Sequence, residues 1–265
     1  MVPRNPNSGR TMDQPRTLAI DIGGSGIKCA LLDDRGRMLG ERIREPTPEK
    51  PVGPAEIVRI IAGAAARLGQ FDRASVGFPG AVRAGRVLTA PNLGTELWGG
   101  FDLEGTLEKL WRKPVRVMND ADVQGFGAIG GKGLEMVLTL GTGAGTALFY
   151  DGKVLPHLEL SHHPIKGNDD YDGYVGRAVL DRKGPKAWSK RVERLIGVLR
   201  TVTNFDHLYI GGGNAKQLDL KLPPDVTIVS NKKGLVGGIA LWRDDNKIEQ
   251  PAANTRRRTA GASAG

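Results

Sequence analysis

The stretch from Leu18 to Asp33, LAIDIGGSGIKCALLD, decides how this chain folds. An apolar run ends at Asp21, crosses a glycine-rich turn and becomes apolar again, which predicts two antiparallel strands joined by a tight turn. Glycine leaves the backbone N–H groups of such a turn accessible, and oriented N–H groups bind anions. The turn and the strand after it offer these residues to a phosphate: Gly23, Gly24, Ser25, Gly26 and Lys28.

A second copy of this pattern occupies residues 137–152, VLTLGTGAGTALFYDG. Its turn repeats the glycines and has a threonine in place of the serine: Gly141, Thr142, Gly143 and Gly145. A single glycine-rich turn is most often only a tight turn, but two copies favour a duplicated unit whose two phosphate loops face one cleft. Strands follow both turns, and no Lys-Ser or Lys-Thr pair closes either one. Neither a dinucleotide-binding fold nor a P-loop is therefore indicated.

The composition is that of a globular protein with one large domain or two lobes, since 39% of its 265 residues are apolar and 25% are charged. The net charge of +9 would suggest a nucleic-acid partner, but more than half of this charge lies at the two ends of the chain. Residues 1–16 hold +2 of this charge and residues 247–265 hold +3. Both ends are rich in small and polar residues. We expect them to be disordered basic tails, and we expect no nucleic-acid partner for the body.

The single cysteine, Cys29, excludes an intrachain disulfide and a cysteine zinc cage, and it is typical of a reducing cytoplasm. The first sixteen residues lack the apolar run of a secretory signal, and no apolar stretch is long enough to span a bilayer. We therefore expect a cytoplasmic protein with no membrane partner.

Strand and helix signals alternate along the body, which predicts an α/β fold. Further strands are expected at residues 37–44, 74–78, 115–118, 207–210 and 226–229, and helices at residues 54–68, 103–111, 188–199 and 235–242. Asp102 is placed to cap the second of these helices. Asn119, Asp120 and Asp122 directly follow a buried strand. Open α/β sheets bind ligands at this end of their strands, so these side chains are candidates for a site.

Six motifs follow one another over residues 17–243: LAIDIGGSGIK, GFPGAV, APN, NDAD, LTLGTGAGTAL and IGGGN. In combination they resemble the ROK family of sugar kinases and, within it, the polyphosphate-dependent glucokinase branch. The resemblance implies the actin-like, hexokinase-like ATPase fold of the ribonuclease H-like type, with two lobes around a central cleft. It implies an N-terminal lobe over 17–117, a C-terminal lobe over 118–233, and a C-terminal helix over 234–246 that packs back on the N-terminal lobe.

On this resemblance, Asp120 is the general base that takes the proton from the attacking sugar hydroxyl. A carboxylate in that role is chemically reasonable, because phosphoryl transfer needs an oriented nucleophile. The simpler alternative is that Asp120 or Asp122 only caps the helix that follows.

The family's sugar-binding residues correspond here to Asn92, Asn119, Glu159, His162 and Asp172. Glu159 and His162 belong to a Glu-x-Gly-His motif, and this chain has Ser161 in place of the glycine. Each also has a simpler interpretation, since asparagine is common in turns and a run of aspartates is more often a solvated loop. The other histidines of this segment are expected to be hydrogen-bonding or surface groups rather than metal ligands.

On the donor side, the resemblance implies that Asp21 organises Mg²⁺, directly or through water, and that Gly211, Gly212 and Gly213 lie beside a nucleotide or polyanion. Magnesium takes few carboxylates when substrate oxygens complete its shell. The family's cysteine-rich zinc segment is missing, as it is in the polyphosphate branch, so no zinc site is expected. Five basic residues are either a track for polyphosphate or the solvated face of a helix: Lys183, Lys186, Lys190, Arg191 and Arg194.

The resemblance implies a kinase of carbohydrate metabolism that transfers a phosphoryl group from polyphosphate, ATP or both to the 6-hydroxyl of glucose or a close hexose. One alternative is an ATP-dependent kinase for a different sugar or amino sugar, favoured by the departure ELSHH. A second alternative is a sugar-sensing protein of the family without turnover, against which the intact Asp120 argues. The resemblance also implies a homodimer.

Overall fold

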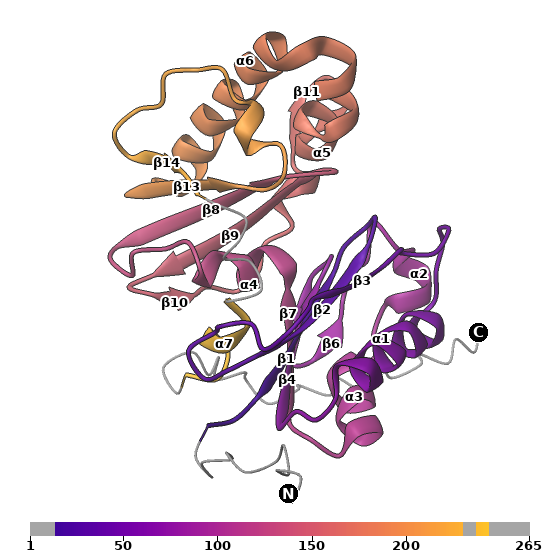
Figure 1. Ribbon diagram of the computed structural model, residues 1–265. Coiled ribbons are helices and arrows are strands. Elements are labelled where there is room, and N and C mark those ends of the chain that lie inside the picture. The colour runs from indigo at the N-terminus through magenta and orange to yellow at the C-terminus, as the bar shows by residue number, and fades with distance from the viewer. Residues whose placement is uncertain (1–13, 230–236, 244–265) are drawn as a thin grey trace, which may run out of the picture.

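In the computed structural model of the protein, residues 14–229 and 237–243 are described (Figure 1). Most of the two predicted tails and the start of the predicted helix 235–242 lie outside the described residues. Within the described ranges, the strands form two five-stranded sheets and two short hairpins. None of the helices in these ranges is long and apolar enough to cross a membrane.

The first sheet has the strand order β3-β2-β1-β4-β7, and the second has the order β10-β9-β8-β13-β14. Their strands are β1 (Thr17–Ile22), β2 (Ile27–Leu32), β3 (Ile43–Glu45), β4 (Arg73–Phe78), β7 (Val115–Asn119), β8 (Leu134–Leu140), β9 (Ala144–Tyr150), β10 (Lys153–Val154), β13 (His207–Gly211) and β14 (Val226–Ile228). In both sheets an antiparallel hairpin is followed by two strands parallel to its first strand. The predicted duplication is therefore present in the topology.

The short hairpins are β5 (Val82–Arg83) with β6 (Arg86–Val87) and β11 (Pro164–Lys166) with β12 (Asp169–Asp170). The helices are α1 (Pro54–Leu68), α2 (Thr95–Trp98), α3 (Leu103–Trp111), α4 (Asp120–Phe126), α5 (Tyr171–Val175), α6 (Arg177–Thr203) and α7 (Gly237–Ala240), with 3₁₀ turns at Leu160–His162 and Ala215–Gln217. Local signals placed several of these elements correctly. Pro54 opens α1, and the Asp102 side chain accepts a hydrogen bond from Gly105 N at the start of α3.

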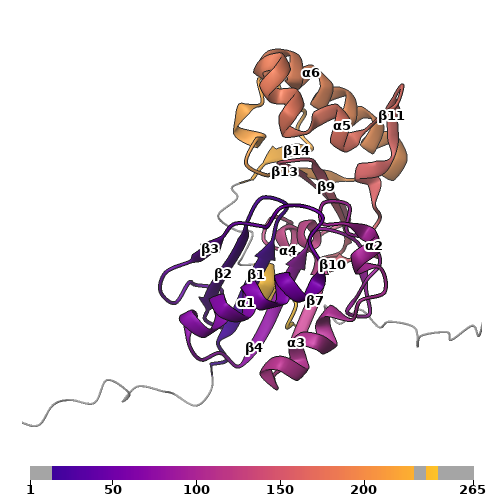
Figure 2. The same ribbon diagram turned by 90° about the vertical axis from the view of Figure 1, so that its right-hand side faces the viewer.

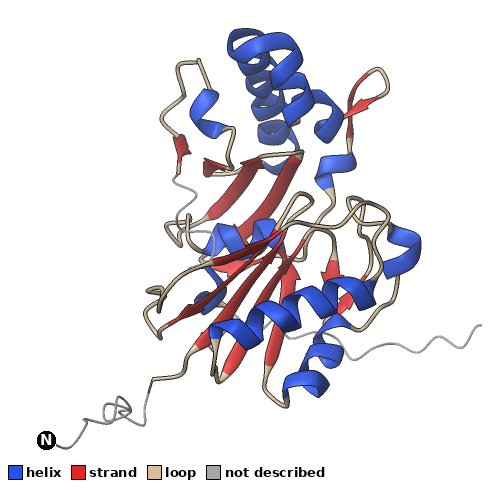
Figure 3. Ribbon diagram, turned by 45° about the vertical axis from the view of Figure 1, so that its right-hand side comes forward, coloured by secondary structure: helices blue, strands red, loops and turns tan. Residues whose placement is uncertain are grey.

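Each sheet has its own apolar core. α1 buries Ile57 and Ile61 against the first sheet, and α6 buries Trp188 and Leu195 against the second (Figure 3). α7 lies on the other face of the first sheet, where Ile239 packs beside Ala19 and Leu32 of β1 and β2. α4 lies between the two sheets and contacts strands of both (Figures 1 and 2).

Two elements differ from the sequence prediction. The strand expected over residues 37–44 is only Ile43–Glu45, because Gly40 adopts a φ of 97° that breaks the extended conformation. The helix expected over residues 188–199 begins earlier, at Arg177, and kinks at Gly184, ahead of Pro185. In addition, β7 continues the first sheet to Asn119, two residues beyond the expected lobe boundary at 117.

Candidate active site

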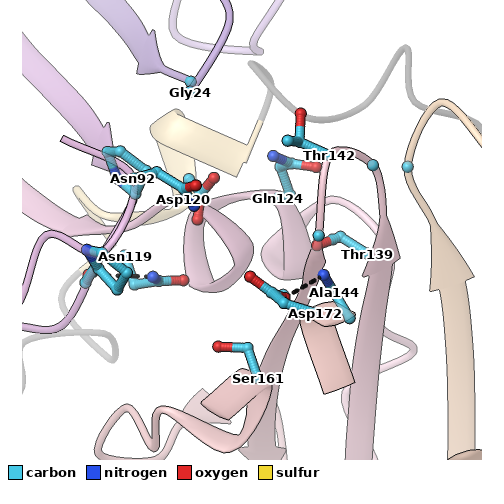
Figure 4. Close-up of a pocket in the computed structure, with 18 of the residues that line it drawn as sticks. Gly24, Asn92, Asn119, Asp120, Gln124, Thr139, Thr142, Ala144, Ser161 and Asp172 are labelled. Atoms are coloured by element: carbon cyan, nitrogen blue, oxygen red, sulfur yellow. Dashed lines mark hydrogen bonds between the residues drawn. The ribbon is translucent and has the colours of Figure 1, made fainter. Parts of the chain in front are cut away.

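A cavity of about 300 Å³ opens between the two sheets, and both glycine turns line it (Figure 4). All the predicted phosphate-side residues except Gly211 line this cavity, as do Asp120 and every predicted sugar-binding residue. Gly211 is instead the last residue of β13 and pairs with Thr139 of β8. The sequence therefore located the cavity correctly from residues that lie far apart along the chain.

Asp120 is the first residue of α4 and follows directly on β7. Gly77 allows this close approach, because a Cβ there would lie 3.3 Å from Asp120 Cα. The Asp120 Oδ1 atom accepts a hydrogen bond from Ala121 N at 2.9 Å. Burial and the nearby negative charge of Asp21 raise the pKa of Asp120 to about 7. A half-buried carboxyl with this pKa is suited to accept a proton near neutral pH.

Asn119 is the residue that caps α4, rather than Asp120 or Asp122. Its Oδ1 accepts from Ala121 N at 2.8 Å and from Asp122 N at 3.4 Å, and its Nδ2 donates to Gly80 O at 3.1 Å. These backbone contacts fix the orientation of the helix on which Asp120 lies. Residue Asn119 is only 6% exposed and its amide is bonded to the backbone. Its contact with a sugar hydroxyl therefore stays a prediction.

On the donor side, Lys28 Nζ donates to Asp21 Oδ2 at 2.7 Å across the register pair of the first hairpin. Within the described residues there is no cluster of three or more acidic, histidine or cysteine side chains that could hold a metal. Asp21 does match what Mg²⁺ needs, because it offers a carboxylate beside the first glycine turn and leaves most of the metal's coordination to a substrate.

On the sugar side, Glu159 accepts from Thr89 Oγ1 at 2.9 Å through its Oε1 atom. Its Oε2 atom lies 3.5 Å from Ser161 Oγ and 3.8 Å from His162 Nε2. Burial opposes ionisation of Glu159, but His157, whose Nε2 lies 3.7 Å from Glu159 Oε1, and the hydrogen bond from Thr89 outweigh burial and lower the pKa of Glu159. Glu159 is therefore an ionised acceptor, and Ser161, which replaces the expected glycine, lies beside its second oxygen.

Asp172 lies closer to the phosphate side than the sequence interpretation placed it. Its Oδ1 accepts from Ala144 N at 2.7 Å, and a Cβ on Gly143 would collide with its carboxylate (Figure 4). Burial raises the pKa of Asp172. The side chain thus supports the second glycine turn, and a direct role toward the sugar stays a prediction.

The five basic residues proposed as a polyphosphate track do not line the cavity. They belong to α6, which lies on the far side of the second sheet from the first sheet (Figures 1 and 2). Arg191 is held locally, since its Nη1 donates to Tyr174 O at 3.2 Å and its guanidinium lies 4.4 Å from the Tyr174 ring. Lys28 and Arg44 are the lysine and arginine side chains among the described residues that do line the cavity.

Sequence reasoning missed several residues around the cavity. His157 is a hydrogen-bonding group, as expected, but its partner was not foreseen: its side chain is 7% exposed and its Nδ1 lies 3.2 Å from Oδ1 of buried Asp122. Thr89 and Gln124 lie outside the quoted motifs, and Thr139, although it belongs to LTLGTGAGTAL, was not singled out. Gln124 and Thr139 line the cavity. Only the position of His157 two residues before Glu159 was a clue in the sequence.

Comparison with known proteins gives a consistent result. The model of the ROK family matches residues 17–162. A polyphosphate glucokinase of Mycobacterium leprae is 32% identical over 86% of this chain and 74% of its own length. The crystal structure of an inorganic polyphosphate/ATP-glucomannokinase from an Arthrobacter strain superimposes with a TM-score of 0.77 at 32% identity, covering 86% of this chain and 100% of that one. An N-acetylmannosamine kinase of Escherichia coli is 31% identical over 64% of this chain and 56% of its own length.

Proposed function

We propose that this chain, which belongs to the ROK family and is a sugar kinase, phosphorylates the 6-hydroxyl of glucose or a close hexose with polyphosphate, ATP or both as donor. Its fold is the actin-like, hexokinase-like ATPase fold, and its reaction is phosphotransfer to an alcohol. The observation that carries the proposal is the position of Asp120 in a cavity lined by both glycine turns.

In the proposed reaction, the Asp120 carboxylate accepts the proton of the sugar 6-hydroxyl as the hydroxyl oxygen bonds to the donor's terminal phosphorus. The bond from that phosphorus to the donor's bridging oxygen breaks, and ADP or a polyphosphate shortened by one phosphate leaves. The two glycine turns both line the cavity. Backbone N–H groups of these turns would hold the donor phosphates. Positioning and charge stabilisation account for most of the catalysis of phosphoryl transfer. A well-placed general base adds about 10²- to 10⁴-fold to the rate.

Asp21 is the residue that would hold Mg²⁺, with Lys28 beside it to balance charge at the first glycine turn. The ion, when bound, neutralises charge on the donor phosphates. Asp21 also acts on the base directly, since its negative charge helps to raise the pKa of Asp120. Any cation bound at Asp21 therefore favours the ionised form of Asp120.

Sugar selection is proposed to rest on Glu159 and His162 together with Asn92 and Asn119, which line the same cavity. The first and second sheets would form the two lobes predicted from the sequence, and their closure over the sugar would exclude water. A cytoplasmic homodimer stays a prediction from the family resemblance.

A substrate panel tests the proposed function. Purified protein is assayed with glucose, mannose and N-acetylmannosamine, each with ATP and with polyphosphate, and the product is identified by ³¹P NMR. We expect glucose 6-phosphate as the main product with at least one donor. Preferred turnover of N-acetylmannosamine would favour the amino-sugar alternative, which the matched N-acetylmannosamine kinase supports. Sugar binding without any turnover would favour the sensor alternative.

A further inference from the structure

A buried histidine joins two carboxylates at the wall of the cavity. His157 lies in the segment after β10, and its side chain is 7% exposed. Its Nδ1 atom is 3.2 Å from Asp122 Oδ1, and its Nε2 atom is 3.7 Å from Glu159 Oε1. Asp122 is on α4, two residues after the proposed base, and its side chain is 4% exposed. Both ring nitrogens therefore face an acid: Asp122 is buried, and the side chain of Glu159 is 23% exposed.

This arrangement favours an imidazolium over a neutral ring. A neutral imidazole donates from only one nitrogen, whereas the protonated ring donates from both. Burial alone would lower the pKa of His157, but the hydrogen bond with Asp122 and the charges of Asp122 and Glu159 outweigh burial and raise it to about 10. The ring thus carries its charge throughout the neutral range.

The same network extends to the first half of the chain through Thr89. Its Oγ1 atom accepts from Ala81 N at 2.9 Å and donates to Glu159 Oε1 at 2.9 Å. One oxygen of Glu159 is thereby held from two sides, by Thr89 and by His157. The other oxygen, Oε2, faces Ser161 and His162, which line the cavity. The network leaves a single oriented oxygen of Glu159 for a ligand.

We propose that His157 is a positioning residue whose buried positive charge fixes Glu159 for the sugar and favours the ionised form of Asp120. The inference rests on the proposed sugar kinase function. The charged groups that interact with the ring are Asp122 and Asp120 on α4 and Glu159 on its own segment, and Thr89 contacts Glu159. The positive charge of His157 lowers the pKa of Asp120, against the effects of burial and Asp21.

His157→Gln tests the proposal, since glutamine keeps one hydrogen-bond donor and loses the charge. The sugar KM should rise about 10- to 100-fold, the effect of losing a hydrogen bond to a charged group. The acidic limb of the pH profile of kcat/KM should move to higher pH, because Asp120 loses the nearby positive charge. Thr89→Val should raise the sugar KM without moving that limb, since it removes a contact and no charge. His207→Gln, on the exposed pair with Thr227 away from the cavity, is the matched control.

An unchanged sugar KM and an unmoved acidic limb in active His157→Gln protein would overturn the proposal. Titration of the four histidines of the unmodified protein by NMR gives a test that needs neither folding of a variant nor turnover. The His157 ring should remain protonated at pH 8, and a neutral ring at pH 7 would equally overturn the proposal. A protein that phosphorylates no sugar but keeps His157 protonated would contradict the proposed function instead.

Discussion

At the scale of single residues, the chemistry of the cavity is concentrated on Asp120. The Asn119 cap fixes the helix that carries Asp120. Burial and Asp21 raise the pKa of Asp120, and His157 lowers it. A carboxyl with a pKa of about 7 is costly to ionise in the folded protein. Function and stability therefore make opposite demands on this residue.

Replacing Asp120 with asparagine should stabilise the protein increasingly as the pH rises. The unfolded carboxyl loses its proton near pH 3.8 and the folded one near pH 7, so the native state holds the extra proton between these values. The unmodified protein therefore loses stability over that interval, and the asparagine variant does not. The difference in Tm, variant minus unmodified protein, should be larger at pH 8 than at pH 4 by at least about 2 °C. A difference that stays constant or shrinks with pH would contradict the raised pKa.

At the scale of elements, the first hairpin and its edge strand carry the positive charge that faces the cavity. Lys28 of β2 pairs in register with Arg44 of β3, and both line the cavity. A Cβ on Gly26 would lie 3.2 Å from Arg44 Nε, so the guanidinium lies beside the first glycine turn. This edge, rather than the basic face of α6, is the better candidate to contact a long polyanionic donor.

Arg44→Glu should impair polyphosphate use more than ATP use. Charge reversal repels every phosphate that passes the β2–β3 edge, and a longer donor places more phosphates there. We expect a rise of about tenfold in the KM for polyphosphate at low salt, and a smaller rise for ATP. Lys190→Glu, an equal charge reversal on α6, is the matched control and should leave both values near those of the unmodified protein. A larger loss in the Lys190 variant would instead support the α6 track considered from the sequence.

The elements also show how far sequence signals reach. α1 was predicted within its observed bounds because Pro54, the apolar spacing and Gly69 all act locally. The prediction of a strand over residues 37–44 was wrong because the alternating charges were given more weight than Gly40, whose positive φ ends the extended conformation. The first turns of α6 were missed because residues 177–187 are largely polar, and only Val179 and Leu180 of this part bury their side chains.

In the molecule as a whole, the end of the described chain, α7 and Trp242, packs on the first sheet. The Ser75 hydroxyl of β4 donates to Gly238 O at 2.7 Å and accepts from Trp242 Nε1 at 2.8 Å. The Trp242 ring lies 5.0 Å from the Arg73 guanidinium and 4.5 Å from that of Arg116. α7 thereby links α4, which carries the proposed base, to the sheet that carries the first glycine turn.

The sequence predicted which residues meet in the cavity but not how they are connected. Glycine turns and acids at strand ends have local signatures, so Asp21, Asp120 and both turns were identified. The contacts of Thr89 with Glu159 and of His157 with Asp122 join residues 70 and 35 positions apart, and no local pattern encodes them. The same holds for Asp172, whose support of the second glycine turn depends on how α5 packs.

The most direct test of the account is glucose phosphorylation by Asp120→Asn protein, measured in parallel with ATP and with polyphosphate. Asparagine keeps the size of the side chain but cannot accept the proton, so kcat should fall about 10²- to 10⁴-fold with every donor that the unmodified protein uses. Glucose binding, measured by calorimetry, should remain within a few-fold of the unmodified protein. Turnover of the variant at the rate of the unmodified protein would contradict the assignment of Asp120 as the base between the two phosphate-binding turns.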